Sequence, residues 1–222
     1  MGKKIAIVQS NYIPWKGYFD LINMVDEFIF YDTVQFTKND WRNQNKIKTP
    51  QALQWLTVPV RVRGKYHQII HETEIDSMDW AKSHWKSLCQ NYRRANHFNA
   101  IAQEFEPLNP QTEYSHLSQL SRTLIEWVYL KLHIKTIISN SWDYQLIDVK
   151  TERLTDLYAQ AGGCEYISGP EAKDYIDECD FSGWGVKLTT MSWPDTKKDS
   201  EGHYLKEEQK SYRLNFGAKL RL

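Results

Sequence analysis

The sequence predicts an α/β fold with a doubly wound, Rossmann-like parallel sheet and a helical insertion or flank. Two short apolar runs, residues 4–9 and 27–32, enclose the helix-like segment "YFDLINMV". Because both runs are apolar throughout and their connection is short, they favour a parallel sheet covered on both faces. The later runs "LQWLTVPV", "IKTIIS" and "CEYIS" have the length of strands. Between the last two, "TERLTDLYAQAGG" is typical of a helix that ends at glycine.

Two amphipathic helices are predicted in the middle of the chain. The residues Trp80, His84, Leu88 and Tyr92 recur every four positions, and apolar residues recur every three or four positions from Leu117 to Val128. We expect one α/β domain over residues 1–192, with a mainly helical region at about 60–132. Residues 193–222 are mostly charged, and a mobile or loosely docked tail is the simplest interpretation of them.

Composition argues against nucleic acid and membranes as partners. Lys and Arg number 28 and Asp and Glu number 28, so the formal net charge is zero and no field of one sign surrounds the molecule. The three cysteines lack the spacing of a metal or redox site, and no apolar stretch reaches the roughly 18 residues of a membrane span. We therefore expect a cytoplasmic protein with no metal and no membrane insertion. The composition specifies no oligomeric state.

Polar and aromatic residues follow the first predicted strand. In an open α/β sheet, ligands bind outside the carboxyl ends of the strands, where loops lead into helices. The segment "QSNYIPWKG" occupies that place, and a helix that begins near its glycine would offer backbone N–H groups to an anion. The alternative is that the aromatic residues only pack the turn. The substrate-binding candidates in this segment are Gln9, Asn11, Tyr12, Trp15, Lys16 and Gly17.

A second polar loop follows the second strand, which ends at Asp32. Side-chain amides and a guanidinium group bind polar ligands without titrating, so Gln35, Arg42 and Asn43 are further substrate-binding candidates. For the lysines of this loop a solvated surface is the better interpretation. The carboxylate of Asp32 is a candidate catalytic base.

A third loop, "SGPEAK", leads from a strand into a predicted helix. Ser168, Gly169 and Lys173 would direct a hydroxyl, free backbone N–H groups and an ammonium at a phosphate. The same residues would also serve simply to start a helix. His84 is the other candidate base, although a histidine on an apolar helix face is more often a core residue. Nucleophile elbows, phosphate-binding glycine loops and dinucleotide fingerprints are missing from the sequence.

With these segments in view, the chain resembles the WbqC-like protein family, bacterial proteins associated with O-antigen and other surface-polysaccharide gene clusters. The matching segments are "QSNYIPWKGYFDLI", "DEFIFYDTVQFTKNDWRNQNKIKTP", "QWLTVPV" and "EYISGPEAKDYI", within residues 4–188. The resemblance implies a role in making a modified sugar or glycan, and it leaves the reaction open.

A weaker resemblance, at the level of the fold, is to nucleotidyltransferases with a His-Ile-Gly-His signature. In this chain "PWKGYFDLI" stands where that signature would, and Trp15 and Tyr18 replace both histidines. The pair Gln35 and Phe36 resembles the Gln-Phe pair that holds the acid substrate in those enzymes. Losing both histidines argues against adenylyl transfer by the usual route and favours a related fold with altered chemistry.

Together these features predict a transferase of O-antigen biosynthesis that moves an acyl or aminoacyl group to an amino sugar or nucleotide sugar. The donor would be bound to coenzyme A or to a carrier, and Asp32 or His84 would accept the proton of the attacking amine. Two alternatives stay open at this point. One is a nucleotidyl- or adenylate-forming transferase with an altered phosphate site, and the other is a non-catalytic protein that binds a glycan precursor.

Overall fold

The computed structural model of the 222-residue chain describes residues 2–77, 79–108, 114–147, 152–169 and 187–191. The chain forms two compact units. Among the described residues, the first, the sheet unit, consists of residues 2–10, 16–34 and 129–191, and the second, the hairpin unit, consists of residues 11–15 and 35–128. That residues 1–192 make one domain stays a prediction, and the charged tail from residue 193 lies outside the described residues.

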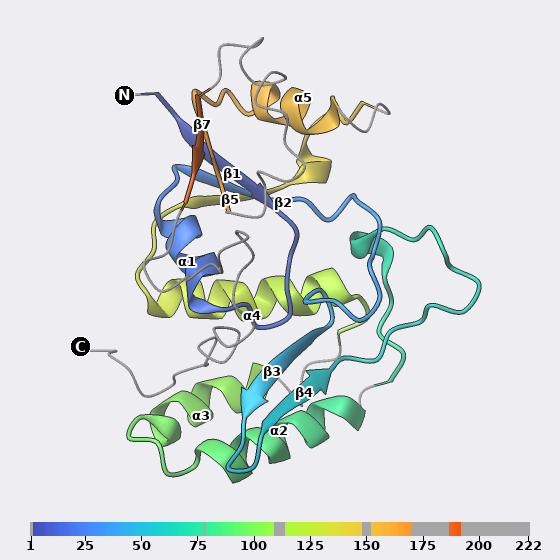
Figure 1. The fold of residues 1–222 in the computed structure, drawn as a ribbon, viewed down its shortest axis with the longest axis vertical. Coiled ribbons are helices and arrows are strands. Elements are labelled where there is room, and N and C mark those ends of the chain that lie inside the picture. Colours follow the sequence, from blue (N-terminus) through green and yellow to red (C-terminus); the bar gives the residue numbers. More distant parts are fainter. Residues whose placement is uncertain (1, 78, 109–113, 148–151, 170–186, 192–222) are drawn as a thin grey trace, which may run out of the picture. The chain divides into compact units, whose positions relative to one another are not determined.

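The sheet unit contains a five-stranded parallel sheet with the order β5-β2-β1-β6-β7 (Figure 1). Its strands are β1 (Lys4–Val8), β2 (Glu27–Phe30), β5 (Ile137–Asn140), β6 (Glu165–Ser168) and β7 (Lys187–Thr190). The chain starts in the centre, builds outward to β5, and then returns to add β6 and β7 on the other side of β1. This confirms the predicted doubly wound α/β fold, and it puts the reversal of strand order between β1 and β6.

Helices cover both faces of this sheet (Figure 1). On one face, Ile5, Ile7 and Ile29 pack with Leu157 and Tyr158 of α5 (Arg153–Gln160). On the other face lies α1 (Lys16–Asn23), whose Tyr18 ring centroid is 5.3 Å from that of Phe28. Because neighbouring residues of a strand point to opposite faces, an apolar run such as "EFIF" supplies both layers of the core.

The hairpin unit combines an antiparallel pair of strands with helices. Its strands are β3 (Gln44–Lys48) and β4 (Leu53–Thr57), and its helices are α2 (Asp79–Tyr92), α3 (Phe98–Leu108) and α4 (Leu117–Lys131), of which the last three residues count with the sheet unit. The run at 53–60 therefore begins with a strand as predicted, but this strand belongs to a hairpin and not to the parallel sheet. The two predicted amphipathic helices are α2 and α4.

The core of the hairpin unit is largely aromatic. The ring of Trp85 on α2 stacks against Phe98 and Phe105 of α3, with centroid distances of 6.2 and 6.1 Å. The ring centroids of Phe105 and of Trp127 on α4 are 5.4 Å apart, and the two rings are inclined by 62°. Much of the high aromatic content of the sequence thus serves packing, which is worth about 1.5–3 kcal/mol for each large apolar side chain that is fully buried.

Candidate functional site

Polar side chains gather at the carboxyl edge of the sheet unit. Because parallel strands end at the same edge, residues that follow neighbouring strands come together there. Four polar residues at the ends of β1, β2, β5 and β6 are buried, with exposed fractions of 1% for Ser10, 2% for Asp32, 0% for Ser141 and 3% for Ser168. Burying polar groups is costly unless hydrogen bonds compensate, so such a row marks this edge as the candidate site.

Backbone hydrogen bonds join the loops at this edge. The N–H of Ser10 donates to Oδ1 of Asp32 at 2.8 Å, and the N–H of Tyr31 donates to the carbonyl of Val8 at 3.0 Å. Further along, the hydroxyls of Thr33 and Ser141 are 2.9 Å apart. The carboxylate of Asp32 is therefore held at a fixed place beside the end of β1, and the hydrogen bond offsets part of the cost of burying it.

Two buried hydroxyls at the edge have no hydrogen-bond partner in the part of the chain that the structure describes. They are Oγ of Ser10 and Oγ of Ser168. These residues follow β1 and end β6, the strands between which the order of the sheet reverses. Ligands of open α/β sheets bind at such a reversal. Since each unpartnered buried hydroxyl costs about 1–3 kcal/mol, polar ligand atoms that bond to these hydroxyls would recover that free energy.

Gly169, which follows β6, is uncrowded within the described residues. No atom of the described residues lies within 4 Å of the position that a Cβ on Gly169 would take. A phosphate or carboxylate could therefore approach this peptide closely, as predicted for the "SGPEAK" loop. The third predicted residue of that loop, Lys173, lies outside the described residues.

The remaining predicted residues of the sheet unit frame the start of α1. The carbonyl of Gln9 accepts a hydrogen bond from the Tyr18 hydroxyl at 3.1 Å, which ties the end of β1 to the helix. Lys16 is exposed at the first position of α1, and Gly17 is buried beside it. The sheet unit thus holds Gln9, Lys16, Gly17, Asp32, Ser168 and Gly169 from the predicted set.

Another part of the predicted set lies in the hairpin unit. Arg42 Nη1 donates to Oδ1 of Asn11, and Arg42 Nη2 lies 3.8 Å from Asp40. Asn43 is 4% exposed and donates from Nδ2 to the carbonyl of Val58 at 2.9 Å. Arg42 is therefore engaged by partners within its own unit, so a role in binding an anion, which stays a prediction, would have to compete with these contacts.

Three further predicted residues of the hairpin unit differ in exposure. Gln35 is exposed, and its Nε2 donates to the carbonyl of Tyr66 at 2.8 Å. Trp15 is partly buried, whereas Tyr12 is only 1% exposed. A ligand could reach Gln35 and Trp15 directly, and their substrate-binding roles stay predictions.

His84 lies in the core of the hairpin unit. Its Nδ1 is 2.9 Å from the Tyr12 hydroxyl, its ring centroid is 5.1 Å from that of Trp80, and only 5% of the residue is exposed. Burial lowers the pKa of the imidazole to about 4, against the opposing effect of a hydrogen bond to the Thr57 backbone. These surroundings favour a structural role over the predicted role as a base.

The loop after β1 also contains a strained residue that the sequence does not reveal. Ile13 has a φ of 46°, a conformation that β-branched residues rarely adopt. Asn45 on β3 holds this loop, because its Nδ2 donates to the carbonyls of Ile13 and Tyr12, the latter at 3.2 Å. Such strain persists only where the surroundings impose it, and it is concentrated at functional loops.

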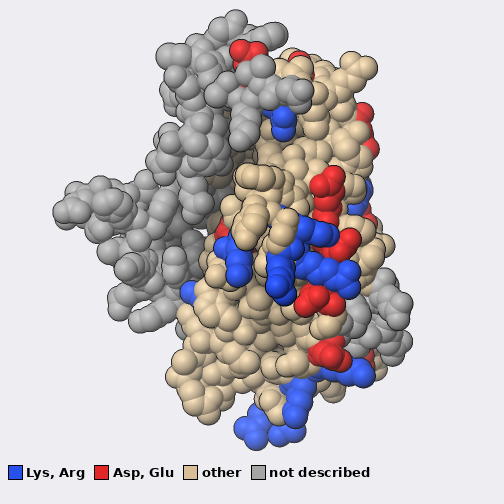
Figure 2. All heavy atoms as spheres, turned by 90° about the vertical axis from the view of Figure 1, so that its right-hand side faces the viewer, with Lys and Arg blue, Asp and Glu red and all other residues tan. Residues whose placement is uncertain are grey.

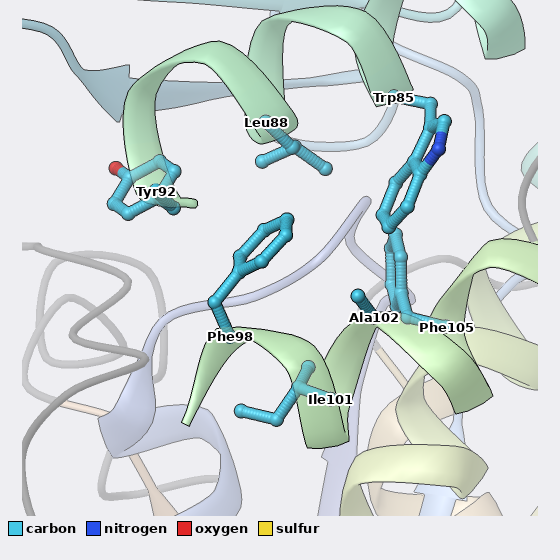
Figure 3. A pocket seen from close by; sticks show the side chains of 7 residues that line it. All are labelled: Trp85, Leu88, Tyr92, Phe98, Ile101, Ala102 and Phe105. Carbon is cyan, nitrogen blue, oxygen red and sulfur yellow. The ribbon is translucent and has the colours of Figure 1, made fainter. Parts of the chain in front are cut away.

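A small apolar pocket lies between α2 and α3, and seven side chains line it (Figure 3). Its volume is about 20 Å³, which suits a single water molecule and no larger ligand. Its lining consists of Trp85, Leu88, Tyr92, Phe98, Ile101, Ala102 and Phe105. We regard this pocket as a packing gap.

Acidic and basic side chains lie next to one another on the surface that Figure 2 shows. In the hairpin unit, Arg61 pairs with Glu74 at 3.3 Å and with Asp76 at 3.4 Å, and Lys65 pairs with Glu74 at 3.1 Å. Mixed charges of this kind create no extended positive field for a nucleic acid.

Comparison with known proteins identifies the family of this chain and a similar protein. The model of the WbqC-like protein family matches residues 9–203. The chain belongs to the WbqC-like protein family. A relative from Mycobacterium tuberculosis (strain ATCC 25618 / H37Rv), described as uncharacterized protein Rv1507c, is 54% identical over 191 residues, which are 86% of this chain and 83% of that protein. No solved structure matches the chain.

The match confirms the resemblance that the sequence segments predict. It covers the buried polar residues at the carboxyl edge of this WbqC-like chain, from Ser10 through Asp32 to Ser168. Among the described helices, none combines the length and the apolar character needed to cross a membrane.

Proposed function

We propose that the protein is an enzyme of surface-polysaccharide biosynthesis that transfers an acyl or aminoacyl group to an amino sugar carried on a nucleotide. The observation that carries this proposal is the pair of unpartnered buried hydroxyls, Ser10 Oγ and Ser168 Oγ, at the reversal of strand order. A buried carboxylate, Asp32, is bonded to the backbone of the same loop as Ser10. Membership of the WbqC-like family supports the polysaccharide context.

In this proposal the end of β6 binds the anionic part of the nucleotide sugar. The hydroxyl of Ser168 and the open backbone at Gly169 would donate to phosphate oxygens, and Lys173 would add a positive charge. The cost of leaving both hydroxyls without a partner is then recovered when the substrate binds. Hydroxyl and backbone donors suit a phosphate because they need no change of protonation.

The proposed reaction uses Asp32 as general base. The amine nitrogen of the sugar attacks the carbonyl carbon of a thioester, so that a C–N bond forms and the C–S bond breaks. Asp32 takes the proton lost by the amine and passes it to the departing thiolate, which leaves as a thiol. Backbone N–H groups at the start of α1, near Gly17, would stabilise the oxyanion.

The first experiment is a thermal-shift screen of the purified protein against nucleotides, nucleotide amino sugars, coenzyme A thioesters and acyl carriers. It is followed by mass spectrometry of the sugar after incubation with both substrates. The proposal expects one nucleotide amino sugar to raise the melting temperature and to gain the mass of one acyl group. Sugar binding that leaves the mass unchanged with every donor would contradict it and would favour a non-catalytic binding protein.

Variants separate the roles of the edge residues. Ser168→Ala should weaken sugar binding about tenfold while leaving the unfolding free energy unchanged or higher, because it removes an unpartnered hydroxyl. Asp32→Asn should keep binding and lose about 100-fold or more in turnover. The matched control is Ser121→Ala, since Ser121 is also fully buried with an unpartnered Oγ, but lies in the hairpin unit. If Ser121→Ala weakened sugar binding as much as Ser168→Ala, the proposed site at the carboxyl edge would be wrong.

A second candidate function is nucleotidyl transfer or adenylate formation. The strand order of the sheet, with its reversal beside β1, is the arrangement that mononucleotide-binding folds share. Release of pyrophosphate from ATP in the presence of a sugar phosphate or a carboxylic acid would support this alternative and overturn the acyl-transfer proposal.

A further inference from the structure

The outward face of the β-hairpin carries exposed apolar side chains. Lys46 on β3 pairs with Trp55 on β4, and Lys48 pairs with Leu53, so these four side chains lie on one face of the two strands. Trp55 is 44% exposed and Leu53 is 40% exposed. The opposite face packs inward. Its Ile47, for comparison, is 1% exposed.

A second indole completes this surface. The ring centroids of Trp41 and Trp55 are 5.4 Å apart, and their planes are inclined by 45°. The ammonium group of Lys46 lies 4.4 Å from the centroid of Trp55 and 6.0 Å from that of Trp41. We name this surface the Trp41–Trp55 face, which consists of Trp41, Lys46, Lys48, Leu53 and Trp55.

The charge of the face is uncompensated. It contains two lysines and no acidic residue, and within the described ranges neither Lys46 nor Lys48 forms an ion pair. Elsewhere in the same unit the basic residues Arg61 and Lys65 are paired with carboxylates. A face with two ammonium groups that have no ion-pair partner among the described residues, beside the exposed indole of Trp55, is complementary to a ligand that is anionic on one side and apolar on the other.

We propose that the Trp41–Trp55 face binds an acidic sugar residue of a glycan, a pyranose that carries a carboxylate. The C–H groups of the pyranose would pack on the exposed indole of Trp55, and its carboxylate would accept hydrogen bonds from Lys46 and Lys48. This binding needs no residue of the carboxyl edge in the sheet unit, so it stands or falls independently of the proposed acyl transfer.

The geometry favours a sugar over a nucleic acid base. Lys46 lies over one face of Trp55 and the Trp41 ring is inclined against it, so the apolar patch left to a ligand is smaller than the open ring face on which a base stacks. A pyranose presents only a few C–H groups and needs a smaller apolar patch. Two lysines also provide fewer phosphate contacts than the basic groove that single-stranded nucleic acids require.

The test is a titration of the ¹⁵N-labelled full chain with trigalacturonate, followed through the indole N–H signals in NMR spectra. Neutral maltotriose and a thymidine oligonucleotide are the comparison ligands. The proposal expects trigalacturonate to shift the signals of Trp41 and Trp55 and to leave the signal of Trp142 unchanged. Trp142 is 39% exposed and lies in the sheet unit, which makes it a matched control.

Two variants test the two halves of the contact. Trp55→Ala should weaken trigalacturonate binding about tenfold or more, and Lys46→Met, which keeps an apolar stem, should do the same by removing the ammonium. Trp142→Ala should bind like the wild type. Equal binding of maltotriose, tighter binding of the oligonucleotide, or no shift at millimolar trigalacturonate would each overturn the proposal.

Discussion

The Tyr12 hydroxyl lies at hydrogen-bond distance, 2.9 Å, from Nδ1 of His84 in the core of the hairpin unit. Which of the two atoms donates depends on the tautomer of the imidazole. Burial raises the pKa of the Tyr12 phenol, so its proton stays in place at all ordinary pH values. The pair is thus a neutral clamp on the loop that follows β1.

The first prediction concerns pH. Burial lowers the pKa of His84 from 6.5 to about 4, so the unfolded chain binds this proton more tightly than the folded one. The contribution of His84 to the unfolding free energy is complete above pH 6.5. As the pH falls from 6.5 toward 4, about 2–3 kcal/mol of unfolding free energy is lost. Denaturant unfolding at pH 7 and pH 4.5 should show this loss in the wild type and a smaller loss in His84→Gln. If the unfolding free energy fell by the same amount in both proteins, the prediction for His84 would be wrong.

Removal of the Tyr12 hydroxyl is the second prediction. Tyr12→Phe leaves Nδ1 of the buried His84 imidazole without its hydrogen-bond partner. This loss should lower the unfolding free energy by about 1–3 kcal/mol. The control is Tyr66→Phe, because Tyr66 is 81% exposed and its hydroxyl remains hydrated in either state. Chemical denaturation measures both variants, and an equal effect of the two substitutions would show that the Tyr12–His84 bond contributes nothing.

Glu27 provides the third prediction, in the sheet unit. Burial alone would raise the pKa of Glu27, yet hydrogen bonds from Lys3, Ser139 and Tyr144 and the charge of Lys3 lower it overall. The carboxylate lies 2.6 Å from Lys3 Nζ and is 5% exposed as a residue. Because the folded pKa is depressed, its stabilisation is present above the ordinary pKa of 4.5 and is lost as the pH falls below it.

Glu27→Gln should therefore lower the unfolding free energy at pH 7 by about 2–3 kcal/mol and flatten the fall in stability below pH 4.5. Glu74→Gln is the control, since Glu74 also has a lowered pKa, caused by Lys65 and Arg61, but forms its ion pairs at the surface. Its substitution should change stability little. If the unfolding free energy of Glu27→Gln fell below pH 4.5 as steeply as that of the wild type, the role assigned to Glu27 would be wrong.

The fourth prediction concerns the strained loop. Asn45→Asp keeps an oxygen for the Lys46 N–H, which Asn45 Oδ1 accepts at 2.7 Å, but loses the donor to the carbonyls of Tyr12 and Ile13. We expect it to destabilise the hairpin unit by about 1–3 kcal/mol and to speed hydrogen exchange in residues 11–15. Exchange that stays at the wild-type rate would mean that the loop holds its conformation without Asn45.

The centre of the parallel sheet was predictable because β1 and β2 are largely buried and read as continuous apolar runs. The hairpin was harder to predict, since β3 is the polar segment "QNKIK", which becomes a strand only by pairing with β4. The short β7, "KLTT", lacks an apolar run in the same way. Pairing partners, and not local propensity, specify these two strands.

The carboxyl edge was predictable in outline for a similar reason. Strand ends of a parallel sheet meet at one edge, so the loops at Gln9, Asp32 and Ser168 were natural candidates. Ser10 went unnoticed because small polar residues are common in loops, and neither its burial nor a φ of 46° at Ile13 leaves a trace in the sequence. The assignment of Arg42 and His84 to another unit than Asp32 also depends on tertiary structure alone.

Within the described ranges the chain enters the hairpin unit twice, first for the five residues Asn11–Trp15 and again at Gln35. A gene fragment that encodes residues 35–128 would therefore lack Tyr12 and leave the His84 imidazole without its phenol. In such a fragment the side-chain amide of Asn45 would also lack its acceptors, the carbonyls of Tyr12 and Ile13. A contiguous gene fragment that keeps these contacts must begin at or before Tyr12, and it then carries α1 and β2 of the sheet unit with it.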